Sequence, residues 1–115
     1  MSDECIFCKI ARKEVPTRPV YEDHDLLAFD DIHPAAPVHV LIVPKEHMVN
    51  LNDAGKNDVP MLGKALRLAA KIADERGVAE TGYRVLVNNG EQGGQVVPHL
   101  HFHLVGGRPL SSGLG

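Results

Sequence analysis

The chain has 115 residues, 43% of them hydrophobic and 23% charged, with a formal net charge of −3 at pH 7. This length fits one domain, residues 1–115, with a core large enough to fold without disulfides. Lysine and arginine are scattered singly and only 4% of residues are aromatic, so the composition argues against nucleic-acid binding.

No apolar run approaches the roughly 18 residues that span a bilayer, and the acidic first ten residues lack the basic stretch of a signal peptide. We therefore expect a cytoplasmic protein that does not engage a membrane. Disulfides are disfavoured in that compartment, so Cys5 and Cys8 indicate metal binding or redox chemistry.

The amino-terminal half is predicted to contain one short helix and three strands. In chain order these are a helix at residues 5–12, strands at 19–23 and 26–29, a loop with two prolines at 31–37, and a strand at 38–43. The last of these is the strongest strand pattern in the sequence, and Pro44 ends it.

A long helix is predicted from about Asp58 to Arg76. Asp58 is the expected N-cap, Pro60 lies in the first turn, where a missing N–H is tolerated, and Gly77 ends the helix. Met61 and Leu68 make its apolar stripe wider than one sheet face needs. That width fits either a well-buried helix in one subunit or a helix that also meets a second subunit.

The carboxyl-terminal half is predicted to contain two more strands. The first covers residues 83–88, a glycine-rich loop follows at 89–95, and the second covers residues 98–105. One long helix among consecutive strands indicates an α+β domain with a largely antiparallel sheet.

Three histidines alternate with apolar residues in the last strand. Because alternate side chains of a strand share a face, His99, His101 and His103 are expected on one face, with Leu100 and Phe102 in the core. Three buried histidines without partners would be costly, so the pattern indicates function.

Two functions suit such a group: the imidazoles bind zinc, or one of them attacks an electrophile while its neighbours orient it. The adjacent Gly93-Gly94-Gln95 offers backbone N–H groups that could converge on an anion. This loop favours phosphate chemistry.

The segment His99-Leu100-His101-Phe102-His103-Leu104-Val105 resembles the defining pattern of the histidine triad (HIT) family, and the chain is most similar to its Hint branch of nucleoside phosphoramidases. The resemblance extends over almost the whole chain. It includes Ile6-Phe7, Leu27-Ala28-Phe29, Asp31-Ile32, Pro34-Ala35-Ala36-Pro37, His39, Pro44-Lys45, Gly82-Tyr83-Arg84, Asn88, Gly93-Gly94-Gln95 and Gly106-Gly107-Arg108-Pro109.

The resemblance implies that His101 is the nucleophile that takes the nucleotidyl group. His103 is then expected to contact the phosphate or the scissile bridging atom, and His39 to arrange the imidazoles. Asp31 resembles a ribose-binding carboxylate. The implied phosphate contacts are Asn88, Gly94 and Gln95, and the implied base pocket is Ile6, Phe7, Ile10, Phe29 and Ile32.

One position departs from the family pattern. Close Hint relatives often carry a hydroxyl residue near the α-phosphate where this chain has Val96. Val96 cannot donate a hydrogen bond, so the preference for leaving groups is expected to differ.

The spacing Cys5-x-x-Cys8 suits zinc, but a tetrahedral site needs two more ligands. His47 and His99 could supply them, and the resemblance to some bacterial relatives implies that set. The alternatives are a buried pair of free thiols and a thioredoxin-type redox pair, although the βαβ context of the latter is missing. His24 and His33 are expected to face solvent.

The resemblance implies a roughly five-stranded antiparallel sheet, one long helix, a short amino-terminal helix, and a homodimer formed by the long helix and the Tyr83–Asn88 strand. It also implies hydrolysis of purine nucleoside phosphoramidates or related adenylyl conjugates through a nucleotidyl-histidine, with structural zinc and no catalytic cofactor. The alternatives are a dinucleoside polyphosphate hydrolase and a non-catalytic nucleotide-binding or scaffold protein.

Overall fold

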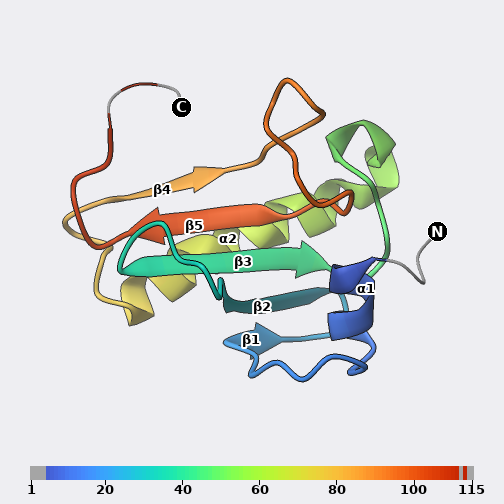
Figure 1. The fold of residues 1–115 in the computed structure, drawn as a ribbon, viewed down its shortest axis with the longest axis horizontal. Helices are drawn as coiled ribbons and strands as arrows, with labels where there is room; N and C mark the ends of the chain where they lie inside the picture. The colour runs from blue at the N-terminus through green and yellow to red at the C-terminus, as the bar shows by residue number, and fades with distance from the viewer. Residues whose placement is uncertain (1–4, 112, 114–115) are drawn as a thin grey trace.

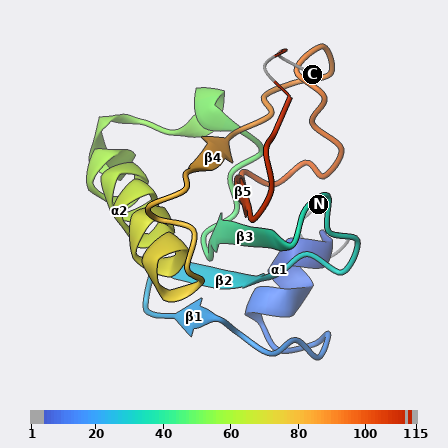
Figure 2. The ribbon, with the colours of Figure 1, turned by 90° about the vertical axis from the view of Figure 1, so that its left-hand side faces the viewer.

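The computed structural model describes residues 5–111 and 113. A five-stranded antiparallel sheet, in the order β1-β2-β3-β5-β4, lies between helix α1 on one face and helix α2 on the other (Figures 1 and 2). The elements are α1 Ile6–Ala11, β1 Tyr21–Glu22, β2 Leu26–Asp30, β3 Val38–Pro44, α2 Val59–Glu75, β4 Tyr83–Leu86 and β5 Phe102–Gly106, with short 3-10 helices at Leu51–Asp53 and Lys56–Asp58. This arrangement is the predicted α+β fold.

The central strand β3 contributes side chains to two separate apolar clusters, one on each face of the sheet. Val40 and Ile42 point toward α2, whereas Leu41 and Val43 point toward α1. All seven residues of β3 are buried, because strands pair with it on both sides and helices cover both faces. Apart from His39, its residues form a continuous apolar run, which is typical of a strand in this position.

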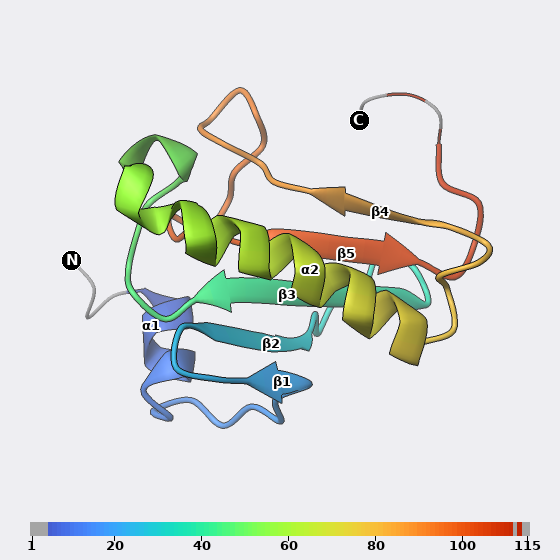
Figure 3. The ribbon, with the colours of Figure 1, turned by 180° about the vertical axis from the view of Figure 1, so that it is seen from behind.

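Helix α2 lies across the sheet (Figure 3). Its apolar stripe packs into the larger cluster, and Met61 and Leu68 are part of that packing. Packing within this chain therefore accounts for these two side chains. The large apolar side chains that α2 leaves exposed are Val59 and Leu66.

Asp58 is the N-cap of α2 as predicted, although its side chain does not cap the helix. Its carboxylate instead accepts the Gly55 N–H at 2.8 Å and closes the preceding 3-10 helix. Pro60 lies in the first turn as expected. Gly77 follows the helix with a φ of 77°, a conformation that glycine adopts without steric cost.

The strand boundaries differ from the prediction. Strand β4 ends at Leu86, where its pairing with β5 stops, and β5 begins only at Phe102. Before that residue, the Leu100 N–H donates to the Met48 carbonyl at 2.7 Å and so anchors the chain to the loop after β3. The alternation of faces nevertheless continues through this stretch, with Leu100 in the α2-side cluster.

Among residues 5–111 and 113, no helix combines the length and the apolar character needed to cross a bilayer.

Candidate active site and metal centre

A cleft of about 1120 Å³ is lined by residues of α1, the ends of the central strands and the glycine-rich loop. Most of the residues expected to bind the nucleotide or to react line it: Ile6, Phe7, Ile10, Phe29, Asp31, Ile32, Asn88, Gly94, Val96, His101 and His103. Of the expected set, His39 and Gln95 are absent from this lining. The structure therefore brings together residues that lie almost a hundred positions apart in the sequence.

One end of the cleft is an apolar wall formed by α1 and β2. Phe7 and Phe29 are both buried, and their rings meet edge to face with centroids 5.8 Å apart. Ile10 is also buried in this cluster. Ile32, in contrast, is 86% exposed, so an apolar side chain at the mouth of the cleft has no cover from the described residues. This end suits a flat aromatic ligand.

His101 is held in a single tautomer by the backbone. Its Nδ1 lies 2.7 Å from the carbonyl oxygen of His99, and a carbonyl only accepts, so Nδ1 carries the proton. The other ring nitrogen, Nε2, then keeps its lone pair. The Phe7 ring packs edge to face against this imidazole at 5.1 Å, which fixes the ring plane. His101 is thus a buried imidazole with one nucleophilic nitrogen.

His39 and His103 are joined by a hydrogen bond whose direction can be assigned. His39 Nδ1 accepts the Ala35 backbone N–H at 3.0 Å, so its proton is on Nε2. That nitrogen lies 2.9 Å from His103 Nδ1 and donates to it. His103 therefore carries its own proton on Nε2, as a hydrogen-bond donor.

The pKa of His103 is lowered to about 4, mainly by burial and also by the nearby His101 and His39, whereas Asp31 acts in the opposite direction. Burial is the dominant cause because a charged imidazole loses its hydration inside the protein. His103 is consequently neutral at pH 7 and acts as a hydrogen-bond donor.

Asp31 lines the cleft, and its carboxylate lies between the backbone N–H of His33 and the imidazole of His39. One carboxylate oxygen accepts the His33 N–H at 2.9 Å, and the other lies 3.5 Å from His39 Nε2. The atoms of Asp31, His39 and His103 that could bind a metal lie within 4.8 Å of one another. The nitrogen lone pairs that face this group are already used in the hydrogen bonds above, so the geometry favours a proton-bearing network over metal binding.

The glycine-rich loop reaches the cleft through Asn88 and Gly94. The Asn88 side chain donates to the Gly94 carbonyl at 3.2 Å, and Gly94 has a φ of 83°. A Cβ at Gly93 would lie 2.5 Å from the Asn89 carbonyl oxygen, so the turn requires glycine there. These two glycines make a tight loop whose backbone borders the histidines.

The Gln95 side chain is engaged inside the loop. Its carbonyl accepts the Gly90 N–H at 2.9 Å, and its amide nitrogen donates to the carbonyls of Val49 and Val97. We expected this residue to contact phosphate, but the structure directs its side chain to three backbone groups. Gln95 holds the loop in shape.

Val96 lies on the loop beside the histidines and is 89% exposed. Neighbouring Val97 lines the same cleft and packs against the α1-side cluster. Position 96 is therefore accessible to whatever group extends out of the cleft past the imidazoles.

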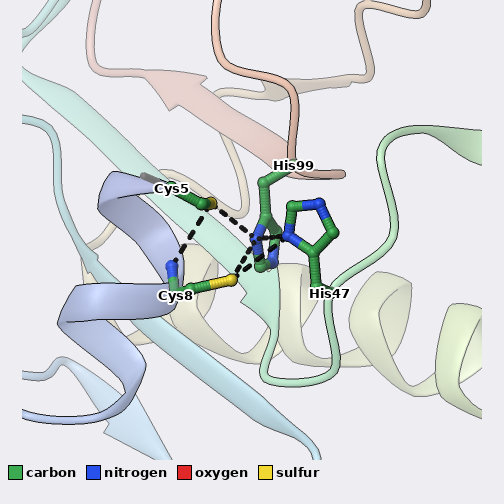
Figure 4. A group of neighbouring side chains, drawn as sticks. All are labelled: Cys5, Cys8, His47 and His99. Carbon is green, nitrogen blue, oxygen red and sulfur yellow. Dashed lines mark hydrogen bonds between the residues drawn. The ribbon is translucent and has the colours of Figure 1, made fainter. Parts of the chain in front are cut away.

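A second cluster, outside the lining of the cleft, joins Cys5, Cys8, His47 and His99 (Figure 4). His99 Nδ1 lies 3.2 Å from Cys5 Sγ, 3.5 Å from Cys8 Sγ and 3.2 Å from His47 Nδ1. His47 Nδ1 also lies 3.2 Å from Cys8 Sγ. Four potential ligand atoms thus converge on one point.

These separations fit zinc. Zinc–nitrogen bonds of about 2.0–2.1 Å and zinc–sulfur bonds of about 2.3 Å place tetrahedral N and S ligands roughly 3.3–3.6 Å apart. The His99 ring is fully buried, and its Nε2 lies 2.8 Å from the Pro44 carbonyl. That bond puts the proton on Nε2 and leaves the Nδ1 lone pair for a metal, as expected of a metal-binding histidine whose other ring nitrogen donates to a carbonyl.

Burial raises the pKa of the Cys8 thiol to about 11, with further contributions from the neighbouring Cys5. A buried thiolate is stable only beside a positive charge, so this environment needs a cation to hold Cys8 in the ligating form. Both cysteines are free thiols in the structure.

The fold explains how the four ligands meet. Cys5 caps α1 and Cys8 is one turn later in it. His47 follows the end of β3 and His99 precedes the start of β5, and these two strands are antiparallel neighbours. Sequence spacing alone relates only the two cysteines.

Residues 12–110 match the HIT domain. The chain belongs to the HIT domain family. It is 47% identical to the purine nucleoside phosphoramidase of Escherichia coli (strain K12) over 110 residues, which are 96% of this chain and 92% of that protein.

Two solved HIT structures are similar in fold. A HIT family hydrolase from Legionella pneumophila Philadelphia 1 matches with a TM-score of 0.94 and 46% identity, over 97% of this chain and all of that one. A Zn-bound histidine triad family protein from Mycobacterium smegmatis matches with a TM-score of 0.81 and 33% identity, over 94% of this chain and 78% of that one. The family expected from the histidine pattern is confirmed.

The cleft also includes residues that the HIT pattern did not single out. They are Val15, Pro16, Thr17, Arg18, Pro19, Val20, Asp30, His33, Leu41, Arg76 and Val97. Arg76, at the end of α2, forms a two-pronged ion pair with Asp30 at 2.8 and 3.0 Å. No local sequence signal relates these two residues. His24 and His33 are exposed as expected, although His33 borders the cleft.

Proposed function

We propose that this chain is a purine nucleoside phosphoramidase that breaks a phosphorus–nitrogen bond through a covalent nucleotidyl-His101 intermediate. The observation that carries the proposal is the bond from His101 Nδ1 to the His99 carbonyl, because it leaves Nε2 as a nucleophile beside a nucleotide-sized cleft. The 47% identity to the E. coli enzyme supports the same reaction.

In the first step the lone pair of His101 Nε2 attacks the α-phosphorus. A new P–N bond to the imidazole forms, and the P–N bond to the substrate amine breaks with its electron pair on the departing nitrogen. That nitrogen takes a proton from water. The Nε2–H of His103 donates a hydrogen bond to the phosphate or the departing atom, and His39 orients His103 through the 2.9 Å bond.

In the second step water attacks the phosphorus of the nucleotidyl-histidine. The P–N bond to His101 breaks, its electron pair returns to Nε2, the water proton is released to solvent, and a nucleoside monophosphate leaves. The His99 carbonyl keeps Nδ1 protonated throughout. Because each step uses only these imidazoles and water, we propose no catalytic cofactor.

The nucleotide is proposed to lie along the cleft with its base on the apolar wall. The base pocket consists of Ile6, Phe7, Ile10, Phe29 and Ile32. Asp31 accepts hydrogen bonds from the ribose hydroxyls, and Asn88, the backbone of Gly94 and Gln95, and the rim residue Val96 surround the phosphate and leaving group. The lining of the cleft supports this proposal, because it includes both the apolar side chains of α1 and β2 and the imidazoles of His101 and His103.

We also propose one structural zinc ion per chain, held by Cys5, Cys8, His47 and His99. When bound, the ion supplies a stable cross-link between α1 and the sheet, without taking part in the reaction. Metal analysis of protein purified under reducing conditions should give about one zinc per chain. The double variant Cys5→Ser/Cys8→Ser should lose the zinc and melt at a lower temperature; a variant that melts like the wild type would favour the free-thiol pair.

The proposed assembly is a homodimer of single-domain chains, residues 1–115, formed through α2 and the Tyr83–Asn88 strand. Strand β4 is at the edge of the sheet and so has one unpaired side, and Leu66 on α2 and Tyr83 on β4 are exposed. Sedimentation should give the mass of two chains. Because thiolate ligands stay reduced in the cytoplasm, that is the proposed compartment.

The decisive experiment is a substrate panel with the wild-type enzyme. Adenosine and guanosine 5′-phosphoramidates should be hydrolysed to the monophosphate, and acid quenching should trap a labelled nucleotidyl-protein. Preferential cleavage of dinucleoside polyphosphates would make the chain a hydrolase of that other class. Binding of monophosphate without turnover of any substrate would make it a nucleotide-binding protein.

A further inference from the structure

One residue belongs to both the metal centre and the active site. The side chain of His99 offers Nδ1 to the cluster of Cys5, Cys8 and His47. Its backbone carbonyl accepts from His101 Nδ1 at 2.7 Å. The position of the His99 backbone therefore depends on what holds its side chain, and it also sets the orientation of the nucleophile.

Helix α1 makes a second link between the two sites. Cys5 and Cys8 bracket Phe7, whose ring packs edge to face against both His99 and His101, with centroids 5.8 and 5.1 Å away. Phe7 and Ile10 also form the apolar wall of the cleft. Whatever fixes the two cysteines thus fixes this wall.

Apart from the apolar contacts of Phe7 and Ile10 with the sheet, α1 has little to keep it in place without a metal. It has six residues, far fewer than the 12–15 or so at which isolated helices become even marginally stable. Thiols make only weak hydrogen bonds. Metal–ligand bonds to Cys5, Cys8, His47 and His99 would replace those contacts with a cross-link from α1 to the end of the β3–β5 pair where β3 stops and β5 starts.

We propose that metal binding at Cys5, Cys8, His47 and His99 assembles the nucleotide cleft, by fixing α1 and by orienting His101 through the His99 carbonyl. Metal and nucleotide then strengthen each other's binding. This inference rests on the proposed zinc site and nucleotide cleft. It assigns His99 as a positioning residue, because it acts through His101.

Reciprocity gives the proposal a quantitative form. If bound zinc tightens nucleotide binding by some factor, bound nucleotide must tighten zinc binding by the same factor. Couplings between sites are typically about 5- to 150-fold. A zinc ion that only stabilised the fold would leave the affinity of the folded protein for nucleotide unchanged.

The first test uses His47→Ala, since His47 is exposed and does not line the cleft. We expect this variant to lose zinc and to bind guanosine monophosphate at least about fivefold more weakly. His47→Cys restores a zinc ligand and should restore both properties. The matched control is His24→Ala, an exposed histidine outside both sites, which should leave zinc content and nucleotide affinity unchanged.

A spectroscopic measurement separates positioning from general destabilisation. In the zinc-loaded protein the ¹⁵N signals of His101 should show a protonated Nδ1 and an unprotonated Nε2. In folded, zinc-free His47→Ala we expect these two signals to move toward each other as the tautomers mix. Unchanged His101 signals together with unchanged nucleotide affinity would overturn the proposal.

Because His47→Ala could fail to fold, the same quantities are measured on the wild-type protein stripped with a chelator in the cold. Guanosine monophosphate should tighten zinc in the chelator competition by the factor found for nucleotide binding, while the sheet amides stay protected from hydrogen exchange. Loss of that protection together with the zinc would mean that the metal acts only through global folding, and the proposal would fail.

These outcomes are independent of turnover. If the wild-type enzyme hydrolyses phosphoramidates but zinc and nucleotide do not affect each other, only the coupling is wrong. If the two ligands are coupled but no substrate is turned over, the proposed reaction is wrong and the coupling stands.

Discussion

His39 Nε2 lies 2.9 Å from His103 Nδ1, and the other nitrogen of His39 accepts the Ala35 N–H. This pair assigns the proton of His103 to Nε2. The rings of His103 and His101 are 4.9 Å apart, and His101 is fixed in the opposite tautomer, with its lone pair on Nε2. A nucleophile and a hydrogen-bond donor therefore stand side by side in the cleft.

Replacing His101 with glycine should abolish turnover by several orders of magnitude while the protein stays folded and binds a purine monophosphate. Covalent catalysis loses most of its rate when the nucleophile is removed. Single-turnover assays with a phosphoramidate and circular dichroism measure both properties. Free imidazole offers a further check, because it should partly restore activity in the vacated space. Near-normal turnover of a folded His101→Gly protein would contradict the mechanism.

The alternation of apolar and histidine residues in 98–105 predicted which side chains share a face, even though β5 begins only at Phe102. Burial on both sides of the sheet decides which face each side chain takes. This holds for residues before Phe102 as well, although they make no strand hydrogen bonds. Asp58 is the N-cap of α2 as predicted, but its side chain makes no capping bond, because its carboxylate accepts the Gly55 N–H of the preceding turn.

Other parts of the site have no local pattern. Arg76 ends a helix on one face of the sheet and reaches Asp30 at the end of a strand, a pairing set by how α2 crosses the sheet. The structural use of Gln95 could not be read from its place in a phosphate-binding motif, because the backbone groups it binds are fixed by the loop conformation. The two cysteines could be paired from spacing, whereas His47 and His99 meet only because β3 and β5 are neighbours.

Acid should destabilise the protein through His103. Burial lowers its pKa from 6.5 to about 4, so between these values the unfolded chain binds a proton that the folded chain does not. The free energy of unfolding therefore falls as the pH decreases through this window, and it is insensitive to His103 above it. Burial also lowers the pKa of His99, which acts in the same direction.

The contribution of His103 is isolated by comparing the wild type with His103→Asn. Urea unfolding is followed across the window, and the asparagine variant should lose less stability as the pH falls. His99 is present in both proteins, so its contribution cancels. Parallel pH profiles for the two proteins would show that His103 is not held neutral by burial.

Asp31→Ala should weaken binding of ribonucleotides much more than binding of their 2′-deoxy counterparts. A carboxylate that accepts from ribose hydroxyls is specific to those hydroxyls, and charged hydrogen bonds contribute roughly 1.5–3 kcal/mol each. Calorimetry with guanosine and deoxyguanosine monophosphate on both proteins measures the difference. Equal losses for the two sugars would mean that Asp31 only holds the turn through its bond to the His33 N–H.

Val96→Ser should raise turnover of phosphoramidates with poor, alkylamine leaving groups. A departing amine needs a proton as its bond to phosphorus breaks, and general acid assistance typically contributes about 10²- to 10⁴-fold. A hydroxyl that only donates a hydrogen bond should contribute less than that. Val96 offers no such group, so in the wild type the assistance falls to His103 and water.

The test compares leaving groups in single-turnover mode, since product release can mask the chemical step. Substrates with fluoride or an acidic phenol need no proton and should respond little to Val96→Ser, and Val96→Ala is the control for a change in size alone. An equal response of both leaving-group classes would place the effect in phosphate binding. No response in either class would mean that the side chain at position 96, although 89% exposed at the edge of the cleft, does not reach the departing group.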